Sequence, residues 1–423
     1  MIAVLLRILL VTLPLTAATA FARDVEYFKQ RRDRLLAALG PREAAIIPAA
    51  WEKELETFRQ GNNFFYFTGI EQPNLLLVLS PAARSRETLF LPARNLEDGS
   101  MSEAWTGGKL GPGSGTEQAT GIAKAAEKGT FEIAFAGIAG ELDRIYFDYV
   151  PAEIDAPRSG AEVLLETIVA RYPHLSVSPL GRLTDSLRTI KDSAEIATIQ
   201  RAVDITGLSL VETIGAVKAG MFEYEVEAMI EYGFNRRGSQ RPGFPSIVGA
   251  GPNTVTLHYN ENRRRIEAGE LLLMDVGAEL DFYTADITRT VPVDGRFTVR
   301  QRQVYETVLA AQQAAIDAVK PGITLGEVHA AASKVIGEAG FAKYFIHYTS
   351  HYLGMDVHDV GRRDEKLSPG MVITVEPGIY IPDEALGVRI EDDVLVTENG
   401  GRVLSRMIPK TADEIESLMQ AGR

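Results

Sequence analysis

Residues 271–291 read LLLMDVGAELDFYTADITRTV, two strand-like apolar runs that each carry an acid near the joining turn. Apolar runs of this length are typical of buried strands. If the stretch folds as a hairpin that turns at Leu280-Asp281, Asp275 and Asp286 lie directly opposite each other, with Cβ atoms roughly 5 Å apart. Two carboxylates this close repel each other. The pattern therefore predicts a bound divalent cation that removes the repulsion.

A second stretch repeats this design about a hundred residues later. Residues 371–381 carry Glu376, and residues 388–397 carry Glu391. A turn centred near Asp383-Glu384 sets the two glutamates opposite each other. The sequence therefore predicts two hairpins, each with a facing pair of acids.

The four acids together carry a formal charge of −4, which two divalent ions would balance, so we expect a dinuclear site. Arg389 lies two residues before Glu391 and faces the same way on a strand. We expect Arg389 to orient Glu391 or a neighbouring acid.

An internal repeat supports the pairing of the two hairpins. Residues 214–220 read IGAVKAG and residues 316–322 read IDAVKPG, an offset of 102. Each copy reads as a helix, a glycine stop, a second helix and then strands. Duplication predicts two halves around a pseudo-twofold axis, with a site between them.

The length of 423 residues exceeds the usual size of a single hydrophobic core and predicts two domains. We expect an α+β protein with an N-terminal α/β domain over residues 24–187 and a catalytic domain over residues 188–423. The second domain begins just before a helix that Asp192 and Glu195 start with a capping-box pattern. In the first domain we expect a helix and three strands, at residues 27–39, 63–70, 75–79 and 88–91.

Residues 1–22 resemble a signal peptide. Arg7 precedes a short apolar run over residues 8–20, and Ala20-Phe21-Ala22 offers a small-x-small cleavage site. The run is too short for a comfortable membrane span, and no later stretch resembles one. We expect a secreted protein with no stable membrane insertion after cleavage, periplasmic if the host is a Gram-negative bacterium.

Charge and cysteine content narrow the possible ligands. The formal net charge of −13 argues against nucleic acid as a partner. The chain has no cysteine, so disulfides, thiolate metal sites and thiol nucleophiles are excluded. Any metal must bind to oxygen and imidazole ligands.

Four of the six histidines fall in two short stretches. His258 lies in Thr-Leu-His-Tyr-Asn, and residues 346–359 contain His347, His351 and His358. One neutral imidazole would complete an oxygen-rich site, and the others would donate protons or contact the substrate. Such a ligand set suits manganese best, followed by cobalt or zinc. We expect His329 to be an ordinary helix position.

These motifs together resemble the pita-bread metallopeptidase family, which includes aminopeptidase P, prolidase and methionine aminopeptidase. The resemblance rests on MDVG at 274–277, ADITRT at 285–290, SHYLGMDVHD at 350–359, TVEPGIY at 374–380 and VRIEDD at 388–393. In the N-terminal half, residues 62–70 and 104–111 are similar to the aminopeptidase P type. The resemblance implies five metal ligands, Asp275, Asp286, His351, Glu376 and Glu391. It also implies substrate-side roles for three further histidines, His258, His347 and His358.

One position departs from the family pattern. Tyr348 follows the first histidine of its stretch, where relatives commonly have glycine. We expect this tyrosine to crowd the loop beside His347 and to change the shape of the substrate pocket, while the metal ligands are unaffected.

The resemblance implies a metallo-exopeptidase that removes the N-terminal residue from peptides with proline in second position. In that reaction Glu376 would carry a proton, and His258 or His358 would stabilise the developing oxyanion. The alternatives are an Xaa-Pro dipeptidase (prolidase), a non-catalytic pita-bread binding protein and a creatine-type amidinohydrolase, the last without a positive signal. Relatives often associate through the N-terminal domain, so a homodimer or homotetramer is expected.

Overall fold

The computed structural model describes residues 25–52, 57–93, 108–149 and 157–422. The chain divides into two compact units after Leu180. This division lies earlier than the predicted boundary at residues 187/188, because helix α7 (Gly181–Thr189) belongs to the second unit, where Arg188 donates a 2.6 Å hydrogen bond to Asp359. The proposed signal peptide, residues 1–22, lies outside the described residues.

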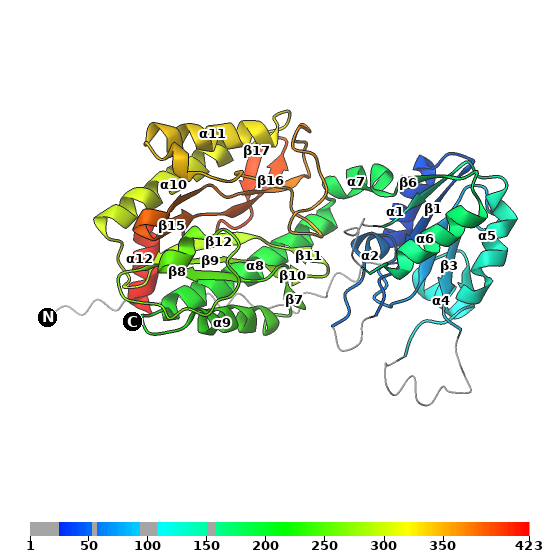
Figure 1. Ribbon diagram of the computed structural model, residues 1–423, viewed down its shortest axis with the longest axis horizontal. Coiled ribbons are helices and arrows are strands. Elements are labelled where there is room, and N and C mark those ends of the chain that lie inside the picture. The colour runs from blue at the N-terminus through cyan, green and yellow to red at the C-terminus, as the bar shows by residue number, and fades with distance from the viewer. Residues whose placement is uncertain (1–24, 53–56, 94–107, 150–156, 423) are drawn as a thin grey trace. The chain divides into compact units, whose positions relative to one another are not determined.

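The first unit is built on a six-stranded mixed sheet in the order β4-β3-β2-β1-β5-β6 (Figure 1). Strand β2 is buried along its whole length, as the apolar run at residues 75–79 predicts, and β1 is buried except at its two end residues. The strands are β1 (Glu43–Pro48), β2 (Leu76–Leu79), β3 (Glu87–Leu91), β4 (Ala125–Glu127), β5 (Arg144–Phe147) and β6 (Ser176–Pro179). The helices are α1 (Val25–Ala38), α2 (Asn62–Thr68), α4 (Ser114–Thr120), α5 (Phe131–Ala139) and α6 (Gly160–Arg171).

The prediction of a strand over residues 63–70 is wrong, because α2 occupies this stretch. The helix is buried from Phe64 to Thr68, so it has no polar face and gives no helical period in the sequence. Its aromatic residues also favour strands by propensity. The signal that identifies the helix is Gly69, which ends it in a left-handed conformation with φ of 66°.

The second unit contains the predicted duplication of a helix pair. Helices α8 (Ser193–Ala216) and α9 (Glu223–Asn235) form the first pair, and α10 (Val299–Ala318) and α11 (Leu325–Glu338) form the second. A glycine lies between the helices of each pair, Gly220 with φ of 94° and Gly322 with φ of 90°. The unit ends with helix α12 (Ala412–Ala421).

Short antiparallel sheets fill the centre of this unit (Figure 1). Three of these sheets have three strands each, in the orders β12-β9-β8, β13-β16-β17 and β11-β10-β7. The fourth sheet pairs β14 with β15. The first-repeat strands are β7 (Arg241–Pro242), β8 (Ile247–Ala250), β9 (Leu271–Val276), β10 (Ala278–Leu280), β11 (Tyr283–Thr284) and β12 (Ile287–Pro292). The second-repeat strands are β13 (Val372–Val375), β14 (Gly378–Ile381), β15 (Leu386–Arg389), β16 (Asp392–Thr397) and β17 (Gly400–Val403).

The first hairpin differs from its prediction in register. Strand β9 pairs Asp275 with Thr288, so Asp275 and Asp286 are not directly opposed. The turn lies at Asp281-Phe282, one residue later than predicted, with φ values of 47° and 69°. Because Asp286 is two residues from Thr288, it remains diagonal to Asp275 on the same face.

The second hairpin has the predicted register. Both of its ladders, β13–β16 and β14–β15, pair residues that are symmetric about Asp383-Glu384. Glu376 and Glu391 lie between the two ladders at equivalent positions, so the predicted opposition of Glu376 and Glu391 is confirmed.

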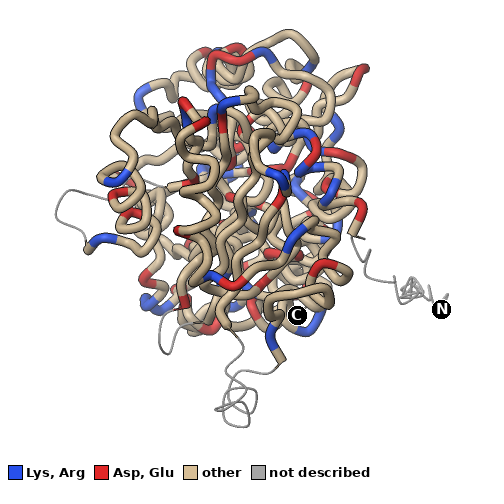
Figure 2. Tube along the Cα trace, turned by 90° about the vertical axis from the view of Figure 1, so that its right-hand side faces the viewer, with Lys and Arg blue, Asp and Glu red and all other residues tan. Residues whose placement is uncertain are grey.

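No helix among the described residues is long and apolar enough to cross a membrane. Basic and acidic residues are interspersed along the described trace (Figure 2), so charge alone does not mark a ligand site. The site is defined instead by which side chains converge.

Candidate metal centre

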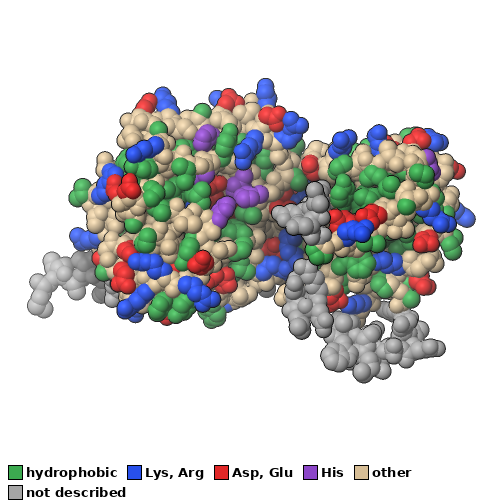
Figure 3. Space-filling view, in the orientation of Figure 1, with side chains coloured by type: hydrophobic (Ala, Val, Ile, Leu, Met, Phe, Trp, Pro, Cys, Tyr) green, Lys and Arg blue, Asp and Glu red, His purple; other side chains and the backbone are tan. Residues whose placement is uncertain are grey.

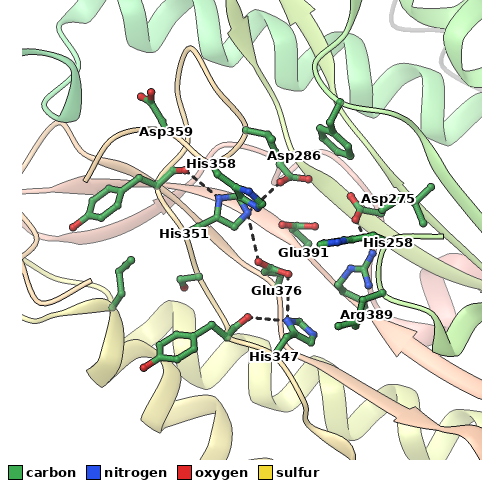
Figure 4. A pocket seen from close by; sticks show the side chains of 18 of the residues that line it. His258, Asp275, Asp286, His347, His351, His358, Asp359, Glu376, Arg389 and Glu391 are labelled. Carbon is green, nitrogen blue, oxygen red and sulfur yellow. Dashed lines mark hydrogen bonds and ion pairs between the residues drawn. The ribbon is translucent and has the colours of Figure 1, made fainter. Parts of the chain in front are cut away.

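A cavity of about 620 Å³ in the second unit collects the acids and histidines identified from the sequence. On the surface, histidine side chains gather in a hollow (Figure 3). At close range, the four acids, four histidines and Arg389 of the predicted site surround one space (Figure 4). All nine predicted site residues line this cavity: His258, Asp275, Asp286, His347, His351, His358, Glu376, Arg389 and Glu391.

The two aspartates hold oxygen atoms that are ready for a cation. One oxygen of Asp275 accepts a 2.6 Å hydrogen bond from Arg389 Nη2. The other oxygen, Oδ1, and the Oδ1 of Asp286 are buried without a hydrogen-bond partner among the described residues. Burial raises the pKa of Asp286 well above its usual range, and Asp275 raises it further. A bound cation would remove both penalties, so the donor set fits a metal.

The two glutamates come from the break between the second-repeat ladders. Glu391 Oε2 accepts a 2.6 Å hydrogen bond from Thr288 Oγ1. Burial raises the pKa of Glu391 well above its usual range, and the charge of Asp286 adds to the effect. Burial also raises the pKa of Glu376 to about 7. Without a cation, ionising these neighbouring buried acids together is therefore unfavourable.

His351 is oriented to present one nitrogen to the acids. Its Nδ1 donates to the carbonyl oxygen of Tyr352 at 3.0 Å, which leaves Nε2 with a lone pair. Nε2 lies 3.3 Å from Asp286 Oδ2 and 3.5 Å from Glu376 Oε1. The His351 segment is fixed by backbone pairing to β13, since Thr374 N donates to His351 O at 3.0 Å. A backbone carbonyl that holds the far ring nitrogen is the usual support of a metal-binding histidine.

Three of these residues form a compact ligand group. Ligand atoms of Asp286, His351 and Glu391 all lie within 4.8 Å of one another. Together with the orphaned Asp275 oxygen beside them, they make an oxygen-rich site with one nitrogen, the composition that the sequence predicts.

A hydrogen-bond chain leads from Arg389 to His347. Arg389 Nη1 donates to Tyr380 Oη at 2.9 Å, and Tyr380 Oη lies 2.9 Å from His347 Nε2. His347 Nδ1 donates to the carbonyl oxygen of Tyr348 at 2.8 Å, so Nε2 accepts the Tyr380 proton. Burial, with a contribution from Arg389, lowers the pKa of His347 to about 4, which keeps the ring neutral.

The rim of the cavity carries the remaining histidines. The rings of His358 and His351 meet edge to face with centroids 4.4 Å apart. Burial lowers the pKa of His358, and His351 lowers it further. His258 is exposed and also lines the cavity. Both rings are placed to contact a substrate over the acids.

Tyr348, which departs from the family pattern, forms an aromatic wall of the same cavity. Its ring stacks on His329 with centroids 4.5 Å apart, and the Arg363 guanidinium lies 4.5 Å from the Tyr348 centroid. His329 Nδ1 lies 2.9 Å from Thr349 Oγ1. His329 lies in helix α11, as the prediction of a helix position has it, and its ring packs behind this wall.

Sequence reasoning missed three polar supports of the acids. Thr288 bridges Arg389 and Glu391, Tyr380 links Arg389 to His347, and Asp393 accepts a 3.1 Å hydrogen bond from the backbone N of Asp286. Thr288 lies on β12, two residues after Asp286, and this spacing is a signal for the same face.

The duplicated fold and this group of acids and imidazole define the protein as a metallopeptidase of the pita-bread class. Comparison with known proteins agrees. Residues 197–398 match the family model described as "Metallopeptidase family M24". Residues 28–146 match the family model described as "Aminopeptidase P, N-terminal domain".

Known proteins are similar over nearly the whole chain. The Xaa-Pro aminopeptidase of Escherichia coli (strain K12) is 33% identical, covering 94% of this chain and 98% of that protein. The solved structure of aminopeptidase P from E. coli with the inhibitor Pro-Leu has a TM-score of 0.85 and 32% identity, covering 95% of this chain and 99% of the other. The Xaa-Pro dipeptidase of Pyrococcus furiosus is 42% identical, but over 52% of this chain and 64% of that protein. The chain therefore belongs to metallopeptidase family M24 and, within it, to the aminopeptidase P family, as the sequence motifs indicate.

Proposed function

We propose that this enzyme removes the N-terminal residue from peptides that have proline in second position. The observation that carries the proposal is the convergence of four acids and His351 in one cavity, in a chain whose aminopeptidase relatives cover both units. The similarity to a dipeptidase covers 52% of this chain and 64% of that protein, which favours the aminopeptidase over the prolidase alternative.

We propose that Asp275, Asp286, His351, Glu376 and Glu391 hold two divalent ions. Arg389 offsets one of the four negative charges, so charge balance alone does not give the number of ions. The orphaned oxygens on both Asp275 and Asp286 support two. Four carboxylates with one imidazole suit manganese best, with cobalt or zinc as alternatives.

When bound, such ions lower the pKa of water and polarise a carbonyl group. The residues of this chain supply the proton steps and the orientation. Glu376 lies between His351 and His347, with Nδ1 of His347 3.6 Å from Oε2. From this position Glu376 can accept a proton from the attacking water and deliver it to the leaving proline nitrogen.

His258 and His358 border the space over the acids and are placed to stabilise the developing negative charge on the carbonyl oxygen. Neutral His347 is fixed by Tyr380 and by the backbone of Tyr348, so it can orient the substrate without adding charge. Phe244, Pro245 and Ile247 give the cavity the apolar wall that a proline ring needs.

The test uses chelated enzyme, defined metals and two substrates. We expect a chelator to abolish cleavage of an Xaa-Pro-Xaa tripeptide and manganese to restore it. We also expect the tripeptide to be cleaved much faster than the Xaa-Pro dipeptide, with product analysis showing the free first residue. Activity that survives complete removal of metal would refute the metal role. Cleavage of the dipeptide alone would favour the prolidase.

We further propose export of the protein, with residues 1–22 removed as a signal peptide, and a homo-oligomer in solution. N-terminal sequencing of the mature protein from cell fractions tests the first proposal. Light scattering tests the second, and an unprocessed cytoplasmic chain or a monomer would contradict them.

A further inference from the structure

A second cavity, of about 570 Å³, lies in the same unit and shares no lining residue with the metal centre. It is bordered by strand β17, by the segment that follows it and by the start of α12. Three cationic side chains line it, Arg402, Arg406 and Lys410. No motif recognised in the sequence falls on these residues.

The floor of this cavity is a buried carboxylate that is already fully bonded. Asp392 accepts hydrogen bonds from Arg289 at 2.8 Å, Lys410 at 2.6 Å, Ser405 at 2.7 Å and Gln312 at 3.1 Å. Two cations therefore share one carboxylate, which leaves an excess of positive charge at the floor. Lys410 uses two of its three donors, on Asp392 and on Gln312 Oε1 at 3.0 Å.

The rim adds two more positive charges. Arg402 and Arg406 are exposed, and neither is in an ion pair with any described carboxylate. Glu414, the other acid that lines the cavity, accepts a hydrogen bond from the backbone N of Thr411 at 3.0 Å. Positive side chains are thus in excess here, although the whole chain has a net charge of −13.

We propose that this cavity is a binding site for a small oxyanion, a carboxylate or a phosphate, held between Arg402, Arg406 and Lys410. A planar guanidinium pairs with such groups through two parallel hydrogen bonds, and an ammonium adds a point charge. Met407, Ile408 and Val403 line the same cavity, so an apolar group attached to the anion would also find contacts. This site goes beyond the peptidase activity and does not depend on it.

Isothermal titration of the full-length protein with inorganic phosphate, and separately with acetate, tests the proposal. We expect saturable binding by the wild-type protein. R402Q/R406Q should bind at least about tenfold more weakly, since one lost charged hydrogen bond corresponds to roughly a factor of ten. The matched control is R171Q/R182Q, which removes two exposed arginines elsewhere and should bind like the wild type.

The variant R402K/R406K keeps both charges but loses the guanidinium fork, and we expect it to bind with intermediate affinity. Binding of phosphate alone would identify a phosphate site, and binding of acetate would identify a carboxylate site. The proposal is overturned if the wild type binds neither anion, if R402Q/R406Q binds as tightly as the wild type, or if the control loses as much affinity.

Discussion

The two acid-bearing hairpins differ in where their ladders break. In the first repeat, Asp275 lies inside the continuous β9–β12 ladder and only Asp286 lies at the break. In the second repeat, both Glu376 and Glu391 lie between two separate ladders. The shorter aspartate side chains are thus held closer to regular sheet, whereas the longer glutamates reach inward from irregular backbone.

The breaks free backbone groups, and these groups join the two repeats. The backbone N of Glu391 donates to Thr288 O at 3.2 Å, and the backbone N of Asp286 donates to Asp393 Oδ2 at 3.1 Å. The same residues that belong to the candidate ligand group therefore connect one half of the unit to the other. We conclude that the metal centre and the junction of the repeats are one structural feature.

The largest expected effect follows from removing one acid at the break of each repeat, in D286A and E391A. Both acids belong to the ligand group with His351, so each variant should lose bound metal. We expect kcat/KM to fall roughly a thousandfold or more, because metal catalysis contributes several kcal/mol. Elemental analysis and peptide kinetics measure this. Exposed Glu398→Gln is the control and should behave as wild type. If one of the two variants kept its metal and activity, the repeats would not contribute equally.

Arg389→Lys should have the next largest effect. Arg389 contacts Asp275, Thr288 and Tyr380 through three different nitrogen atoms. A single ammonium group cannot reproduce this fork, so we expect metal affinity to fall about 10- to 100-fold, the usual cost of losing such a support. Metal titration of chelated protein measures the change.

The matched control for this variant is Arg300→Lys, since Arg300 makes an exposed pair with Glu384 on the second hairpin. Equal metal affinity in R389K and wild type would show that Asp275 needs no partner from the other repeat.

Most of the site was predictable because strand spacing and side-chain face are local properties. The opposition of Glu376 and Glu391 followed from a turn whose centre the sequence places correctly at Asp383-Glu384. The first hairpin was misjudged because Asp281-Phe282 takes a left-handed turn that a phenylalanine does not signal. One residue of error in the turn was enough to change the partner of Asp275.

Contacts between distant segments were not predictable from spacing. Thr288 meets Arg389 and Glu391 only because the repeats pack together, and no local pattern encodes that packing. Likewise, the stacking of His329 on Tyr348 joins a helix to a loop. In the first unit, α2 was mistaken for a strand because burial on all sides removed its period.

We expect a smaller effect from removing the threonine hydroxyl groups that support the two glutamates, in T288V and T374V. Thr288 Oγ1 lies 2.6 Å from Glu391 Oε2, whereas Thr374 Oγ1 lies 3.5 Å from Glu376 Oε1. We expect T288V to lower metal affinity about tenfold, at the low end for such supports, and T374V to lower it less. Metal titration of both variants compares them. If T374V had the larger effect, the hydrogen bond from Thr288 to Glu391, which joins the two repeats, would not be the stronger support.

The smallest effect concerns the glycine stops, Gly220 and Gly322, which have nearly the same left-handed φ in the two repeats. An alanine at such a φ is strained, so G220A and G322A should each lower the free energy of unfolding by about 1 kcal/mol. Chemical denaturation measures the two values. The control is Gly337→Ala inside α11, where a Cβ meets open space and should stabilise by up to about 1 kcal/mol. If the two helix pairs are equivalent, G220A and G322A should lower the free energy of unfolding by equal amounts. The difference between the two repeats would then arise in their hairpins. Clearly unequal amounts would place part of that difference in the helices.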